Sequence, residues 1–129
     1  MAQTEAATTA EELLELAAAV YDEHIERAIV FNSWNVPHDG FWKNQNYLGM
    51  EILHIKKGDS IVEIHRYHGN SGRDLFVQEF GESAENLKIM RSRNGDISAF
   101  TYWDGFKRSV SEIPEASIVR VSELITSQL

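Results

Sequence analysis

Short apolar runs separated by turn signals occupy the chain from Tyr47 to Glu112, and this pattern restricts the fold more than any other feature. The runs alternate apolar and polar residues, and each ends near glycine, asparagine or aspartate. Alternation with period two indicates strands, because successive side chains point to opposite faces of a sheet. We therefore predict an antiparallel meander of about six strands, placed near 48–56, 60–68, 74–80, 86–93, 96–103 and 106–112.

Two turn sequences predict the register of this sheet. Gly58-Asp59 and Asn94-Gly95 suit two-residue hairpin turns, in which both central residues adopt positive φ. A slip of one residue would reverse every side chain, so apolar pairing tests the scheme. The expected pairs are Leu53 with Ile64, Ile55 with Val62, Glu51 with Arg66, Ile89 with Phe100, and Leu87 with Tyr102.

An amphipathic helix is predicted before the sheet. Thr9 and Glu12 have the spacing of a capping box, and apolar residues follow at helical spacing. We expect this helix to end near Phe31 and Asn32, where turn residues begin. The sequence thus predicts a flexible leader over 1–8 and a single α+β domain over 9–129.

The C-terminal segment fits two kinds of structure. Pro114 suits the start of a helix over Glu115 to Leu129, with apolar residues on its inner face. The β-branched stretch from Ser117 to Val121 fits a strand as well. We favour a short helix, which completes a curved sheet with one helix at each end of the chain.

Both faces of the predicted sheet carry apolar residues, and one helix cannot cover both. One face would hold Leu53, Ile55, Val62, Ile64, Leu75 and Val77; the other would hold Met50, Ile52, Ile61, Tyr67, Phe76 and Phe80. Large exposed apolar patches are rare on monomers. Either the sheet curls around a ligand cavity, or a partner or a second copy in a homodimer covers the second face.

The charge of the chain is concentrated at its N-terminal end. Residues 1–33 hold seven acidic residues against Arg27 alone, so most of the net charge of −8 lies there. Such a segment repels phosphate backbones, which argues against nucleic-acid binding. It is either a solvated helix face that maintains solubility or an electronegative surface for a basic protein partner. The second interpretation assigns partner contacts to Glu11, Glu15, Asp22 and Glu26.

The stretch SWNVPHDGFW, residues 33–42, places four ring side chains in an expected turn. Trp34 and Trp42 either fold back over the open end of the sheet or anchor a partner, since tryptophan is enriched at interface hot spots. In the second case His38 and Asp39 supply the polar rim.

One histidine cluster offers chemistry of another kind. The first hairpin sets His54 opposite Glu63, with His65 as a diagonal neighbour. This cluster is either a polar cross-strand pairing or an acid–base group beside a pocket lined by Tyr67, Phe76 and Phe80. Spacing typical of metal ligands is missing from the sequence, and we predict neither a metal nor a cofactor.

The sequence favours a role without catalysis. Cysteine is absent, so no thiol nucleophile or disulfide exists, and no Gly-x-Ser-x-Gly motif occurs. No apolar run approaches the roughly 20 residues that span a bilayer, and we expect a soluble, cytoplasmic protein. The predicted function is a small acidic module that neutralises or regulates a protein partner; the alternative is a small-molecule-binding protein or a simple acid–base enzyme.

Overall fold

The computed structural model describes residues 6–31, 38–45, 51–68, 72–81, 87–101, 107–108 and 112–128. They form the predicted α+β fold, with a helix at each end of the chain and a sheet between them. The elements are α1 (Ala10–His24), β1 (Ile29–Val30), β2 (Gly40–Gln45), β3 (Glu51–Lys57), β4 (Ser60–Arg66), β5 (Arg73–Phe80), β6 (Leu87–Ser92), β7 (Ile97–Thr101), β8 (Lys107–Arg108) and α2 (Glu115–Thr126).

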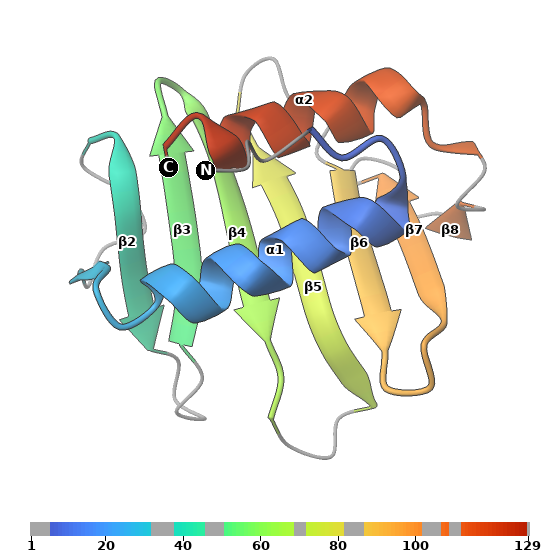
Figure 1. Ribbon diagram of the computed structural model, residues 1–129, viewed down its shortest axis with the longest axis horizontal. Coiled ribbons are helices and arrows are strands. Elements are labelled where there is room, and N and C mark those ends of the chain that lie inside the picture. The colour runs from blue at the N-terminus through green and yellow to red at the C-terminus, as the bar shows by residue number, and fades with distance from the viewer. Residues whose placement is uncertain are drawn as a thin grey trace, which may run out of the picture.

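The described strands form one sheet in the order of the sequence, from β1 to β8. β1 pairs in parallel with β2, and all later neighbours are antiparallel. The sheet does not close on itself, because its order begins at β1 and ends at β8. Both helices lie on the same face of the sheet. α1 crosses the strands obliquely, and α2 lies beside α1 (Figure 1).

The helices cover the face that the alternation predicted as the inner one. Every apolar residue assigned to it is almost completely buried, namely Leu53, Ile55, Val62, Ile64, Leu75 and Val77. They pack against Leu13, Leu14 and Ala17 of α1 and against Ile118, Val121 and Ile125 of α2. This two-layer arrangement of helices on a sheet is the main core of the protein.

The predicted cap of α1 is confirmed, whereas its predicted end is wrong. The Glu12 amide donates to Thr9 Oγ1 at 3.1 Å, which satisfies one of the free N–H groups of the first turn. The helix ends at His24, well before Phe31. Ile29 and Val30 are β-branched and pair with β2 instead, so the backbone must leave the helix before them.

The C-terminal segment is a helix, as we favoured. α2 begins after Pro114 and buries Ile118, Val121 and Ile125. It also holds the N-terminal segment, because the amide of Ala7 donates to the buried Oγ of Ser122 at 2.7 Å. Ala7, near the end of the predicted leader, is therefore packed; residues 1–5 lie outside the described residues.

The first predicted hairpin register is confirmed. Leu53 faces Ile64 and Ile55 faces Val62 across a two-residue turn at Gly58-Asp59. Gly58 has φ of +63°, the conformation for which glycine is favoured there. Arg66, which we expected opposite Glu51, forms an ion pair with Asp22 of α1 at 3.2 Å.

The second predicted register is wrong by one residue. Ile89 faces Ala99 and Leu87 faces Thr101, because the loop has three residues rather than two. The amide of Ser92 bonds to the carbonyl of Asp96, and Gly95 adopts a positive φ at the third loop position. Asn94 Oδ1 accepts the Asp96 amide at 3.0 Å, and this local bond favours the longer turn.

Two strands were not predicted. β2 covers Gly40–Gln45, within and after the stretch that we assigned to a turn, and β1 adds two residues at the sheet edge. Apolar and polar residues do not alternate along β2, because neighbouring aromatic residues pack on opposite faces of the sheet. Phe41 stacks on His24, and Trp42 meets Phe31. The period-two signal fails where both faces of a strand are covered.

The sheet face opposite the helices, here called the second face, carries no helix of the described residues (Figure 1). Ile52, Ile61 and Phe80 are half-buried there, and Phe76 is buried; Met50 lies outside the described residues. Covering of this face by a second copy stays a prediction.

Candidate functional site

The outer face of α1 and the turn that follows it carry the acidic residues predicted for partner contact. Glu11, Glu15, Asp22 and Glu26 are all exposed, and Glu12 and Glu23 join them. Within the described part of the chain, salt bridges reach two of these six carboxylates: Asp22 pairs with Arg66, and Glu23 lies 4.0 Å from His24. We call these six residues the acidic face.

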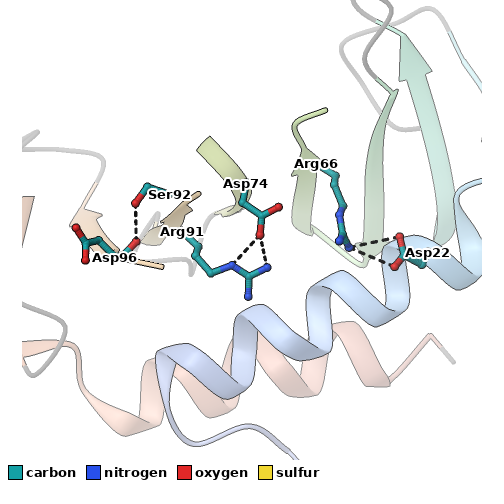
Figure 2. A network of polar contacts seen from close by, with 6 residues as sticks. All are labelled: Asp22, Arg66, Asp74, Arg91, Ser92 and Asp96. Atoms are coloured by element: carbon teal, nitrogen blue, oxygen red, sulfur yellow. Dashed lines mark hydrogen bonds and ion pairs between the residues drawn. The ribbon is translucent and has the colours of Figure 1, made fainter. Parts of the chain in front are cut away.

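Ion pairs along the sheet lie beneath and beside this helix (Figure 2). Arg66 reaches from β4 toward Asp22, and Arg91 of β6 pairs with Asp74 of β5, with its Nε 2.8 Å from Oδ2. These pairs use basic groups of the sheet. They leave the N-terminal half of the acidic face uncompensated, since Glu11, Glu12 and Glu15 have no salt bridge to a described residue.

Glu12 differs from its neighbours in its local contacts. The hydroxyl of Thr9 donates to its Oε1 at 3.0 Å, and that of Thr8 does so at 3.0 Å. These hydrogen bonds, first that of Thr9 and then that of Thr8, hold the pKa of Glu12 below its ordinary value. Glu12 therefore belongs to the helix cap as well as to the acidic face.

Residues 38–42, the described part of the SWNVPHDGFW stretch, include exposed and buried side chains. His38 and Asp39 are exposed, and Trp34 lies outside the described residues. Trp42 is only 6% exposed, and its indole N–H donates to the carbonyl of His38 at 2.8 Å. Asp39 accepts the Gly58 amide at 2.8 Å, so residues 38 and 39 are held by Trp42 of β2 and by the turn between β3 and β4.

A groove of about 430 Å³ lies at the C-terminal end of α1. Its walls include two predicted contact residues, Asp22 and Glu26, together with Tyr21, Ile25, Glu51 and His68. Tyr21 bonds to the Glu51 carbonyl at 2.9 Å; burial, followed by the charge of Glu51, raises the pKa of its hydroxyl. Ile29 and Val30, 56% and 61% exposed, follow the helix at the sheet edge.

The structure brings together all three residues of the predicted histidine cluster on the second face. His54 faces Glu63 in the register, and its Nδ1 lies 3.7 Å from Glu63 Oε2. His65 Nε2 lies 2.8 Å from Glu63 Oε1. Asn44 of β2 completes the row, with its Oδ1 2.8 Å from His54 Nε2.

Aromatic and cationic groups surround this row. Phe31 meets the His54 ring edge-on at 5.1 Å between centroids, and Phe76 meets the His65 ring at 4.9 Å. Lys88 Nζ lies 4.6 Å from the Phe76 ring centre, and the Arg73 guanidinium lies over Tyr67 at 5.8 Å. Tyr67, Phe76 and Phe80, proposed to line a pocket, are buried or half-buried.

Sequence reasoning missed Asn44, Phe31 and Lys88 as members of this cluster. Asn44 belongs to β2 and Phe31 follows β1, and we predicted neither strand. Residues two apart in a strand share one face, so Trp42 and Asn44 lie on the face opposite to Phe41 and Lys43. This spacing is the signal that could have placed Asn44 on the same face as His54.

Burial controls the protonation of His54. Its side chain is almost fully enclosed, and this desolvation lowers the pKa of the imidazole; Glu63 opposes the shift, and His65 adds to it. At neutral pH His54 is therefore uncharged, and its Nε2–H can donate to Asn44 Oδ1.

This lowered pKa predicts how stability depends on pH. The folded pKa lies below the ordinary value near 6.5, so between the two values the unfolded chain binds a proton that the folded chain does not. The His54 contribution should be fully present above about pH 6.5 and lost as pH falls toward the folded pKa. Urea unfolding across this pH range should show that the free energy of unfolding falls less on acidification for His54→Gln than for the wild type. An equal loss in both proteins would contradict the assignment.

Comparison with known protein families, curated proteins and solved structures found no match to this chain. Within the described ranges, no group of three or more His, Asp or Glu side chains is arranged to hold a metal ion. Neither described helix is long and apolar enough to cross a membrane.

Proposed function

We propose that the protein is a small acidic binding module that neutralises or regulates a basic protein partner in the cytoplasm, as an inhibitor, an immunity protein or an adaptor does. The acidic face of α1 carries the proposal. It gathers six exposed carboxylates, five on a helix that is packed on the sheet and the sixth, Glu26, just after its end. The rigid support favours binding, because little conformational entropy is lost at the contact surface.

Only part of this charge serves the stability of the helix. Glu11 and Glu12 are in the first turn, where negative charge is favourable, but Asp22 and Glu23 are in the last turn, where it is not. Glu11 and Glu15 are one turn apart, and like charges at this spacing repel. A surface with such a cost is more readily explained by recognition than by folding.

The same charges would determine how a partner arrives. A surface of one sign attracts an oppositely charged protein over distances near the Debye length, which is about 8–10 Å at ordinary salt concentrations. Attraction of this kind accelerates association more than it slows dissociation. The groove beside Asp22 and Glu26, with Ile29 and Val30 exposed nearby, offers apolar contacts next to the charged ones.

Reversing charge on the acidic face should weaken binding without weakening the fold. In the double variant Glu15→Lys/Glu26→Lys, the new lysine at 15 follows Glu11 by one turn, and such pairs stabilise helices by about 0.2–0.5 kcal/mol. We expect an unchanged or slightly raised unfolding free energy and an association rate about tenfold lower at low salt. The partner is first isolated from native lysate, and its association is then measured by surface plasmon resonance.

The matched control is Glu112→Lys/Glu123→Lys, which changes the net charge equally at two exposed positions outside α1. It should leave the association rate within about twofold of the wild type. An equal loss of association rate in both variants would show that overall charge, and not the acidic face, determines the rate. An association rate independent of salt in the wild type would overturn the proposal.

A further inference from the structure

The Glu63 carboxylate sets the tautomer of His65. An ionised carboxylate accepts hydrogen bonds and donates none, so the 2.8 Å contact requires a proton on His65 Nε2. The lone pair of the neutral ring is then on Nδ1. Within the described part of the chain Nδ1 accepts no hydrogen bond, and it is not fully buried. This is how a carboxylate prepares a histidine to accept a proton.

His65 and His54 differ in access although Glu63 contacts both. The His65 side chain is 16% exposed, twice the 8% of His54. His54 is held by Asn44 and meets the ring of Phe31 edge-on, so its imidazole is enclosed. His65 is therefore the member of the cluster that an incoming molecule can reach.

The Phe76 ring lies in contact with both His65 and the ammonium group of Lys88. His65 meets this ring on one side, and Lys88 Nζ lies 4.6 Å from its centre. Burial, followed by the charge of Arg73, lowers the pKa of Lys88. A partly desolvated ammonium stabilises nearby negative charge more strongly than a solvated one does.

We propose that His65 is a general base, positioned by Glu63, in a second-face site that hydrolyses small aryl esters. This inference is independent of the proposed partner binding by α1. The aryl group packs beside Phe76. His65 Nδ1 removes a proton from water as the water oxygen bonds to the ester carbonyl carbon. The resulting oxyanion faces Lys88. Cleavage of the ester C–O bond then releases the phenolate and the carboxylic acid, and the imidazolium returns its proton to the phenolate or to solvent.

Hydrolysis of p-nitrophenyl acetate by the full chain tests this assignment. We expect the wild type to hydrolyse this ester faster than free imidazole does. His65→Gln should lower the hydrolysis rate about a hundredfold, which is typical for removal of a general base. His68→Gln is the matched control, because His68 is exposed and three residues away; its rate should stay within about twofold of the wild type. A wild-type rate no higher than that of free imidazole per histidine, or an equal loss in both variants, would overturn the proposal.

Two readouts separate positioning from structural support. Glu63→Gln should lower kcat and leave KM within about twofold, because the carboxylate that fixes the His65 tautomer is lost while the aryl contact at Phe76 remains. If that variant unfolds, long-range ¹H–¹⁵N correlation on the wild type still reports the His65 tautomer. A proton on Nε2 at neutral pH supports the assignment, and a proton on Nδ1 contradicts it.

Discussion

Replacing Ile64 with alanine should lower the free energy of unfolding by about 2–5 kcal/mol. Ile64 is 0% exposed, on a central strand that contacts both helices. Its removal leaves a cavity between the two layers of the core, and the rigid sheet can close this space only in part. Chemical denaturation of both proteins, monitored by circular dichroism, measures the difference.

Ile61→Ala is the matched control on the same strand. Ile61 points to the second face and is half-buried, so its truncation should cost only about 1 kcal/mol. An equal loss at both positions would mean that the second face is covered in solution as completely as the first. That result would support a second copy on this face, and the dependence of stability on protein concentration would then identify it.

Arg120→Met should lower the free energy of unfolding by about 1–3 kcal/mol. Glu79 is only 3% exposed on the helix side of the sheet, and Arg120 of α2 lies against its carboxylate. Loss of the guanidinium removes a partner of a buried charge, which costs more than loss of a surface contact. Urea unfolding measures the difference.

Two controls accompany this substitution. In the double variant Glu79→Gln/Arg120→Met, part of the lost stability should return, because the buried charge is gone. Arg91→Met breaks a pair with Asp74 in which both side chains are about a quarter exposed, and should cost less than about 1 kcal/mol. Similar losses for Arg91→Met and Arg120→Met would show that burial does not govern these pairs.

The first hairpin could be predicted in detail because its information is local. Gly58-Asp59 forms a two-residue turn, so the apolar pairing of Leu53 with Ile64 follows directly. The same reasoning failed at Asn94-Gly95, where a side-chain bond from Asn94 favours a loop one residue longer. Turn dipeptides specify that the chain reverses, and the local hydrogen bonds determine the register.

The histidine cluster was predicted only in part for a related reason. His54, Glu63 and His65 belong to one hairpin, and its register brings them together. Asn44 reaches His54 from β2, and Lys88 reaches Phe76 from β6. The Lys88 contact depends on the register between β5 and β6, which alternation alone does not specify. Burial of Trp42 likewise depends on Phe31 and His38, which approach it from outside the strand.

The order of residues by itself determined the α+β class, the capped start of α1, the central strands and the separation of an acidic helix from a nearly neutral sheet. These features follow from periodicity and turn chemistry, which act over a few neighbouring residues. Only the tertiary structure decided that both helices lie on one side, that β2 extends the sheet, and which histidine is enclosed. Such outcomes depend on contacts between segments far apart in the chain, and no local pattern records them.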